Sequence, residues 1–247
     1  LARDTIFAAV MIILNGMVGL CLLVGGVRHR EQIFGTRGVS STLAVLAALS
    51  VLTLILPNYT TSVAGPYYSP AQLVAVALVS LVLYATFVLV QTVRHRDYFL
   101  PQGAAATDEE SHAPSPSGWT TAASSVLLLV ALVVVVLLAK AIAPTLEAAV
   151  ASVGAPKAVV GVVIAALVLL PEGVAAVRAA RANRLQSSMN LALGSALASI
   201  GLTIPAVAVV SLVSGWHLVL GLDGKSTVLL GLSLFLTDLD RDHVDIR

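Results

Sequence analysis

Apolar residues dominate this chain in long runs that short polar segments separate. A helix needs about 20 apolar residues to cross a bilayer, with a usual range of roughly 17–25. Six runs meet that requirement: residues 5–26, 40–56, 71–93, 120–139, 157–177 and 189–213. A seventh run, 227–236, stops at Thr237-Asp238. The pattern predicts an all-α polytopic membrane protein with six long spans and a short seventh element.

The composition supports that prediction and excludes several other classes. Apolar residues make up 58% of the chain and charged residues only 11%, whereas a soluble domain has about 25% charged residues. Disorder needs low hydrophobicity and high charge, and nucleic-acid binding needs a basic face. The net charge is +1, so we expect the lipid bilayer as a partner and no nucleic acid.

The charges between the runs indicate an orientation. Basic residues concentrate in the loops 27–39, 94–118 and 178–188, whereas 57–70 carries no charge and 140–156 carries one Lys and one Glu. Positively charged loops are typical of the cytoplasmic side. We therefore expect a multi-pass protein of the cell membrane with the three basic loops in the cytoplasm.

The longest loop, 94–118, has the composition of a soluble linker and divides the chain. It contains Asp108-Glu109-Glu110 followed by His112, which could bind a cation weakly. We interpret it as a solvated cytoplasmic acidic linker between residues 1–93 and 119–236. The last segment, 237–247, has alternating acids without the Gly and final Glu of a calcium loop, and we expect a solvated polar tail.

Glu172 is the one acid of the sequence that lies inside an apolar run. It precedes Arg178 by six residues, about 9 Å along a helix. A charge at such depth costs about 2.5–3.5 kcal/mol on insertion scales, and it is tolerated mainly where the side chain faces the bundle interior. We expect Glu172 to point toward Ser195 or Ser199 and to bind a cation or a proton; the alternative is a structural acid paired with Arg178.

The neighbours of Glu172 favour the functional interpretation. Pro171 removes a backbone donor and frees the carbonyl of Leu167, and Gly173 loosens the same turn. We therefore expect a helix break at Pro171 and Gly173. Freed carbonyls beside a carboxylate form an oxygen-rich site that suits a hard cation such as Ca2+.

The sixth run carries hydroxyl groups at helical spacing. They lie on one face of a helix: Ser188, Ser195, Ser199 and Thr203. A second face is small enough for close approach by another helix: Asn190, Gly194, Gly201 and Pro205. Such a stripe alone is typical of hydrogen bonds between helices, but beside Glu172 it is a candidate wall of an ion site. Asn15-Gly16 is a similar polar insert in the first run.

These motifs resemble the second signature repeat of the cation/proton exchangers in the calcium/cation antiporter superfamily, in particular the bacterial ChaA-type calcium/proton antiporters. The likeness rests on Pro171-Glu172-Gly173, Met189-Asn190-Leu191, Gly194-Ser195 and Pro205. The segment from Met11 to Gly19 is similar to the end of the first repeat of that family. The resemblance extends to about Phe235.

The resemblance implies two inverted five-helix repeats with the ion site where the repeats meet. Residues 1–93 would be the end of the first repeat and 119–236 a C-terminally short second repeat. Glu172 would be the cation- or proton-binding carboxylate and the metal ligand, with Asn15 beside it; Ser195, Ser199 and Asn190 complete the candidate set. The function implied is exchange of Ca2+, or of Na+ or K+, for protons across a bacterial inner membrane. We expect no cofactor and leave a homo-oligomer open.

Two departures from the family pattern bear on activity. Ala198 stands where many relatives carry a glutamine, which affects the choice of cation. The acidic helix of the first repeat, which the family places before the segment matching Leu1, is not in this sequence. We therefore expect weak Ca2+ binding and no proton exchange by these 247 residues alone.

Three functional classes remain open for this sequence. A secondary antiporter is favoured, and a non-transporting membrane fragment that needs a missing repeat half is the alternative. A membrane enzyme is disfavoured, because intramembrane proteases need a Gly-x-Ser-x-Gly with His, or two Asp, within spans. No predicted span of this sequence contains His or Asp.

Overall fold

The computed structural model describes residues 2–30, 32, 34–100, 117–152, 154, 156 and 158–244. These residues are helical apart from their connections and one isolated antiparallel bridge between Tyr67 and Val219. The helices are α1 (Ala2–Met11), α2 (Val18–His29), α3 (Thr36–Ser50), α4 (Pro70–Leu89), α5 (Gly118–Ser152), α6 (Ala158–Arg181), α7 (Leu185–Ser214) and α8 (Gly224–Val244).

Short π-helical and 3₁₀ segments extend or join several of these helices. A π-helical segment, Ile12–Met17, joins α1 to α2 into one span. Two more, Val51–Ile55 and Val90–Arg94, extend α3 and α4. The 3₁₀ segments are Leu56–Tyr59 and Arg96–Tyr98. Six helices of the described chain are long and apolar enough to cross a membrane, which confirms the predicted number of long spans.

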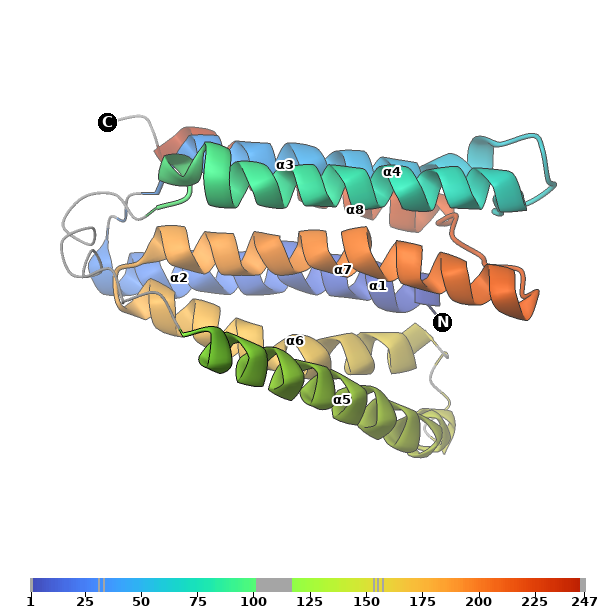
Figure 1. Ribbon diagram of the computed structural model, residues 1–247. Helices are drawn as coiled ribbons and strands as arrows, with labels where there is room; N and C mark the ends of the chain where they lie inside the picture. Colours follow the sequence, from blue (N-terminus) through green and yellow to red (C-terminus); the bar gives the residue numbers. More distant parts are fainter. Residues whose placement is uncertain are drawn as a thin grey trace.

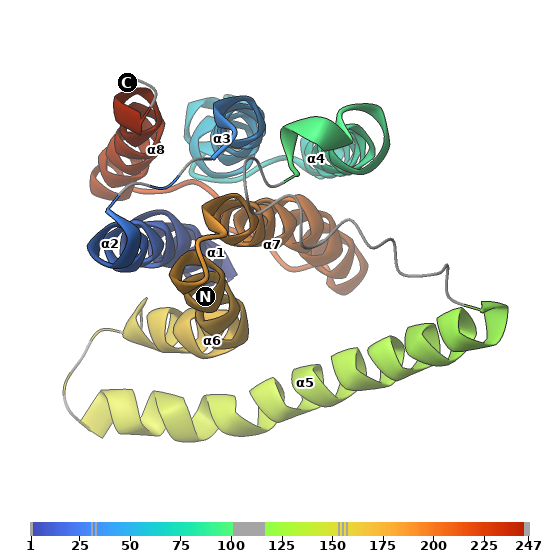
Figure 2. The same ribbon diagram turned by 90° about the vertical axis from the view of Figure 1, so that its left-hand side faces the viewer.

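Helix α7 lies at the centre of the bundle (Figures 1 and 2). It packs against the first span, α3, α4 and α6. Helices α3, α4 and α8 lie on one side of it, while α6 and then α5 lie on the other, as Figure 2 shows. Apolar residues on several faces of α7 are buried because helices surround it: Met189, Leu193, Ala196, Leu197, Ile200 and Ile204.

Two glycines permit close contacts between these helices. A methyl group at Gly201 of α7 would come within 2.8 Å of the Cβ of Tyr84 on α4. One at Gly161 of α6 would come within 3.2 Å of the hydroxyl oxygen of Thr5. Gly201 therefore acts as the predicted close-packing residue. Gly194 does not, because no heavy atom lies within 4 Å of a Cβ placed there.

Two helices extend beyond their apolar runs. Helix α5 continues to Ser152 through Pro144, although 140–156 reads as a loop in the sequence. Helix α8 starts at Gly224 and continues to Val244, so the short seventh element is a helix of 21 residues. Residues 237–244 of the polar tail are therefore helical, because backbone hydrogen bonding continues where the apolar run ends.

The predicted helix break is also corrected. Helix α6 remains α-helical through Pro171 and Gly173. The irregular backbone lies in the neighbouring span instead, in the π-helical segment Ile12–Met17 that contains Asn15. Proline lacks only one donor, and a helix held by flanking turns can continue past it.

The basic loops meet at one end of the bundle. The ring of His29 donates a hydrogen bond of 2.9 Å to the carbonyl of Arg181. Gln32 donates one of the same length to the carbonyl of Ala180, and the guanidinium of Arg37 lies 5.7 Å from the centre of the Tyr98 ring. The described parts of the loops 27–39, 94–118 and 178–188 therefore share one side, hereafter the basic end.

Candidate functional site

Glu172 lies on the inward face of α6. The buried positions of this helix recur every three or four residues, and Glu172 falls among them: Ala165, Leu169, Ala176 and Ala180. The residue as a whole is partly buried, and its Oε2 atom is fully buried without a hydrogen-bond partner. A carboxylate oxygen that is desolvated and unpaired is costly.

The alternative role for Glu172, a surface ion pair with Arg178, is not observed. No ion pair joins these two side chains in the described structure, and Arg178 is exposed. Arg178 lies at the basic end of α6, whereas the Glu172 carboxylate is turned toward the bundle. The charge of Glu172 is therefore left without a compensating protein cation among the residues that the structure describes.

Ser195 lies level with Glu172. Glu172 precedes the end of α6 by nine residues and Ser195 follows the start of α7 by ten, so each lies about 14–15 Å from the connecting turn. Ser199 lies one turn farther from the basic end. Both serines are partly buried, and neither hydroxyl has a hydrogen-bond partner among the described residues. They are available to bind an ion or water.

Asn15 lies at the same depth as Glu172. Positions Gly161 and Gly173 of α6 face Thr5 and Met17 of the first span. The difference between the two residue numbers is the same in both contacts, so the two helices keep one register along their length. In that register Asn15 lies level with Pro171. The amide nitrogen of Asn15 donates to the carbonyl of Met11 at 3.1 Å and to the hydroxyl of Ser233 at 3.0 Å. Its carbonyl oxygen has no partner in the described structure.

Asn190 occupies a different environment. Its amide nitrogen donates to the carbonyl of Phe99, and its oxygen accepts a hydrogen bond of 2.9 Å from Gln186. It follows the start of α7 by five residues, about 8 Å along the helix and so nearer the basic end than Glu172. With both amide atoms engaged, Asn190 joins the 94–118 loop to α7, and no hydrogen bond among the described residues links it to Glu172.

Several buried polar residues did not stand out in the sequence. Gln186 is 1% exposed and accepts a hydrogen bond from the backbone N–H of Gly35. Ser50, Ser80 and Ser188 are fully buried. The hydroxyls of Ser50 and Ser80 have no partner in the described structure, whereas the Ser188 hydroxyl lies against the thiol of Cys21. Each is a single hydroxyl or amide in an apolar helix, a weak signal. Ser188 alone belonged to the predicted stripe.

The acids and metal-binding side chains do not cluster elsewhere. Across the residues that the structure describes, no three His, Cys, Asp or Glu side chains come together in a way that could hold a metal ion. The acidic segment Asp108-Glu109-Glu110 and His112 lie outside the described residues. Among the described residues, Glu172 is the acid on the inward face of α6, with Ser195 of α7 and Asn15 of the first span at a similar depth.

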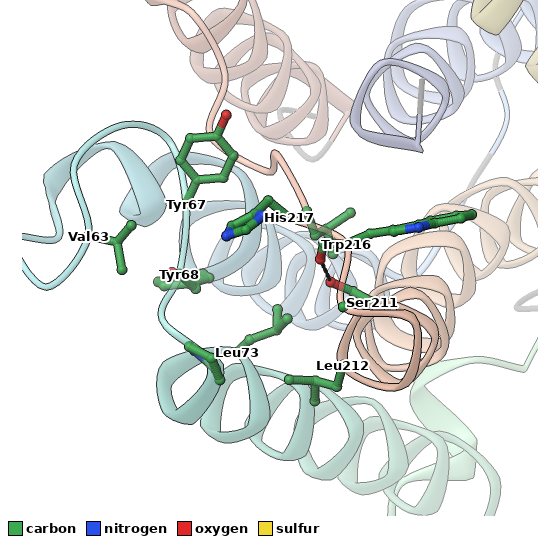
Figure 3. Close-up of a pocket in the computed structure, with 11 residues that line it drawn as sticks. Val63, Tyr67, Tyr68, Leu73, Ser211, Leu212, Trp216 and His217 are labelled. Atoms are coloured by element: carbon green, nitrogen blue, oxygen red, sulfur yellow. Dashed lines mark hydrogen bonds between the residues drawn. The ribbon is translucent and has the colours of Figure 1, made fainter.

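A separate pocket of about 190 Å³ lies at the end of the bundle opposite the basic end, between the start of α4 and the end of α7 (Figure 3). The rings of Tyr67 and His217 meet edge to face at 6.3 Å. Ser211 donates to the carbonyl of Trp216. Burial raises the pKa of Tyr68 to about 12. No carboxylate is among the residues that line this pocket.

Comparison with known families gives one match that covers most of the chain. The model of the family described as sodium/calcium exchanger protein matches residues 1–93 and 123–241. The match includes Asn15, Glu172 and the hydroxyl stripe of α7.

Two curated relatives match along nearly the whole chain. A protein of Sinorhizobium fredii named as an ionic transporter, y4hA, is 51% identical over 95% of this chain and 63% of its own length. The sodium-potassium/proton antiporter ChaA of Escherichia coli is 33% identical over 96% of this chain and 64% of its own length. The chain thus spans somewhat less than two thirds of the length of these relatives.

Two solved structures share the fold. The structure of native YfkE superposes with a TM-score of 0.71 at 16% identity, covering 97% of this chain and 67% of that one. The crystal structure of the H+/Ca2+ exchanger CAX gives 0.66 at 17% identity, covering 95% of this chain and 57% of that one. The chain therefore shares its helical arrangement with YfkE and with the H+/Ca2+ exchanger CAX.

Proposed function

This chain belongs to the sodium/calcium exchanger protein family, and on that premise we propose that it carries the cation/proton-binding carboxylate of an antiporter. The exchange is of a cation, with Ca2+ as first candidate, for protons. One observation carries the proposal: the Oε2 atom of Glu172 is buried and unpaired on the inward face of α6. It lies level with free oxygens of Ser195 and Asn15.

Proton exchange follows from the environment of Glu172. Burial disfavours the isolated carboxylate, and a nearby cation favours it. In the proposed exchange, the Glu172 carboxylate binds either a proton or a cation. Because one group serves both ligands, binding of one excludes the other, which is the requirement for antiport.

In this proposal, the atoms that bind the cation together with Glu172 are oxygens. Ca2+ takes 6–8 oxygen ligands, commonly including more than one carboxylate. The described residues offer one carboxylate with hydroxyl and amide oxygens, so we expect them to bind Ca2+ weakly by themselves. A second acid from outside these residues would complete the charge balance.

A monovalent cation is the second candidate. A single carboxylate neutralises Na+ or K+ fully, and Ala198 adds no further ligand to α7. The relative ChaA is named as a sodium-potassium/proton antiporter, whereas CAX is named as an H+/Ca2+ exchanger. The cations named for these two proteins differ, so a binding measurement has to identify the cation that this chain exchanges.

The orientation belongs to the same proposal. Positively charged loops face the cytoplasm, and the described parts of the three basic loops meet at one end. We place the protein in a bacterial inner membrane with its basic end on the cytoplasmic side. Its partners in this proposal are the lipid bilayer, inorganic cations and protons, and it has no resident cofactor. Residues 1–93 and 119–236 act as parts of two repeats joined by the acidic linker.

The test is cation binding coupled to proton release. Calorimetric titration of the purified chain with Ca2+, Na+ or K+ in buffers of different ionisation enthalpy gives the number of protons released per cation. We expect one proton per bound cation, and none with Glu172→Gln. Binding of every cation without proton release, or unchanged release by the Gln variant, would remove Glu172 from the exchange.

A matched control is Glu147→Gln. Glu147 is an exposed acid on α5, and its loss should leave the proton count unchanged. Transport is then measured in vesicles with an imposed pH gradient. For these 247 residues alone we expect binding without uptake, as for a membrane module that needs a further repeat half. Cation uptake that is abolished by Glu172→Gln but retained by Glu147→Gln would show that these residues exchange ions by themselves.

A further inference from the structure

An apolar groove runs along the outer side of the first span and α6. It has a volume of about 550 Å³. The first span contributes Ile12, Gly16, Met17 and Leu20, and α6 contributes apolar residues from Ala166 to Val177. Glu172 is not among the lining residues, so the groove lies apart from the candidate ion site.

Two glycines hollow this groove. A Cβ at Gly16 would have its nearest neighbour, Ile12, at 4.0 Å, and a Cβ at Gly173 would meet Met17 at 3.6 Å. Both distances are ordinary van der Waals contacts. The helices would therefore accept larger residues at both positions, and the glycines leave empty volume where helix packing does not demand it.

One end of the groove is cationic. Arg178 and Arg181 line it where α6 reaches the basic end. Both side chains are exposed, and neither has an acidic partner in the described structure. The groove is therefore apolar along its length and positively charged at a single end.

The dimensions match one leaflet of a bilayer. From Ala166 to Val177 the helix rises about 17 Å, and half of a hydrocarbon core is about 15 Å thick. An acyl chain that lies along this part brings its headgroup to the level of Arg178 and Arg181. Anionic phospholipids are attracted to basic residues at the cytoplasmic surface.

We propose that this groove binds an anionic phospholipid, with an acyl chain against Gly16 and Gly173 and the phosphate between Arg178 and Arg181. Guanidinium groups bind phosphate through charge-assisted, bidentate hydrogen bonds. The length of the groove and the charge at its end select an anionic lipid of one leaflet over a neutral lipid.

The experiment measures retained lipid by native mass spectrometry of the full 247-residue chain, purified in detergent with phosphatidylglycerol or phosphatidylcholine. We expect preferential retention of phosphatidylglycerol. A juxtamembrane arginine contributes about fivefold to such binding, so Arg178→Gln with Arg181→Gln should weaken retention by about 25-fold. The matched control is Arg94→Gln with Arg96→Gln, a basic pair of the same end outside the groove, which should retain the lipid.

A second variant tests the apolar part. Ala166→Phe places a ring in the groove at an exposed position of α6 and should reduce phosphatidylglycerol retention while helicity by circular dichroism stays unchanged. Equal retention of the two lipids, equal losses in the two double variants, or full retention by Ala166→Phe would each overturn the proposal. The last result would mean that something other than an acyl chain, such as a further helix, covers the groove.

Discussion

Asn15 donates a hydrogen bond of 3.0 Å to Ser233, which joins the first span to α8 across 218 positions of the sequence. The hydroxyl of Ser233 in turn donates a hydrogen bond of 2.8 Å to the carbonyl of Leu229. This arrangement fixes the amide plane of Asn15 with its nitrogen toward α8 and its oxygen unengaged. A π-helical turn widens the backbone at this residue, a feature that is frequent at functional sites.

The contact predicts a measurable role for Ser233. Ser233→Ala leaves the Asn15 amide nitrogen with one partner fewer, and a hydrogen bond of this kind contributes about 1 kcal/mol. We expect cation affinity, measured by calorimetry, to fall by about fivefold through misplacement of Asn15. Asn15→Ala should lower it more, because the ligand oxygen is also lost.

Ser125→Ala is the matched control for Ser233→Ala. Ser125 also bonds back to a carbonyl of its own helix, Thr121, at 2.9 Å, but it has no partner on another helix among those described. We expect unchanged affinity. If Ser125→Ala and Ser233→Ala had equal effects, the contact between Asn15 and α8 would have no role in binding.

The approach of α4 to α7 depends on Gly201. Gly201→Ala places a methyl group 2.8 Å from the Cβ of Tyr84, and overpacking of this kind costs about 1–3 kcal/mol. We expect a lower midpoint of thermal unfolding in detergent. Gly194→Ala is the control: open space surrounds that position, and Ala favours a helix over Gly by about 0.8–1 kcal/mol. A destabilisation of equal size by both variants would refute the packing explanation.

The apolar runs predicted the six long spans because the thickness of a bilayer and the rise of a helix together set how many apolar residues a span needs. They underestimated α5 and α8. Hydropathy ends where polar residues begin, at Lys140 and Thr237, whereas backbone hydrogen bonding continues to Ser152 and Val244. A helix that continues beyond its apolar run ends where its backbone hydrogen bonding ends, and hydropathy does not show that position.

The candidate site was predictable in part. Glu172 stands out because a charge in an apolar run is costly, and its inward orientation follows from the helical period of α6. Asn15 and Asn190 look alike in the sequence, yet the structure separates them. Asn190 is engaged by Phe99, 91 positions away, and such long-range contacts leave no local pattern. The π-helical turn at Asn15 likewise follows from packing rather than from the residues.

Asp223 gives a prediction for pH. Hydrogen bonds from Ser226 and from the backbone at the start of α8 lower the pKa of this exposed carboxyl. A lowered pKa in the folded state means that the ionised cap stabilises α8 above the unfolded pKa of about 3.9. This contribution declines as the pH falls toward and through the lowered value.

Limited proteolysis of the loop before α8 at pH values between about 6 and 2 measures that decline. We expect cleavage near Asp223 to increase as the pH falls below about 4. Asp223→Asn should flatten this dependence, because an amide still caps the helix without titrating. Asp97→Asn, at an exposed acid in another loop, should keep the wild-type profile. An unchanged profile for Asp223→Asn would assign the acid sensitivity to other carboxyls.

Glu172 predicts an ion-dependent stability. A ligand that binds only the folded state stabilises it by RT ln(1 + [L]/Kd), about 2.7 kcal/mol at 100 times Kd. The wild-type unfolding midpoint should therefore rise with the concentration of the transported cation. Glu172→Gln should remove the dependence on cation while leaving the ion-free protein at least as stable, because a neutral amide relieves the buried, unpaired Oε2 atom. A variant that is less stable without cation, yet still responds to it, would show that the carboxylate supports the fold and that the cation binds elsewhere.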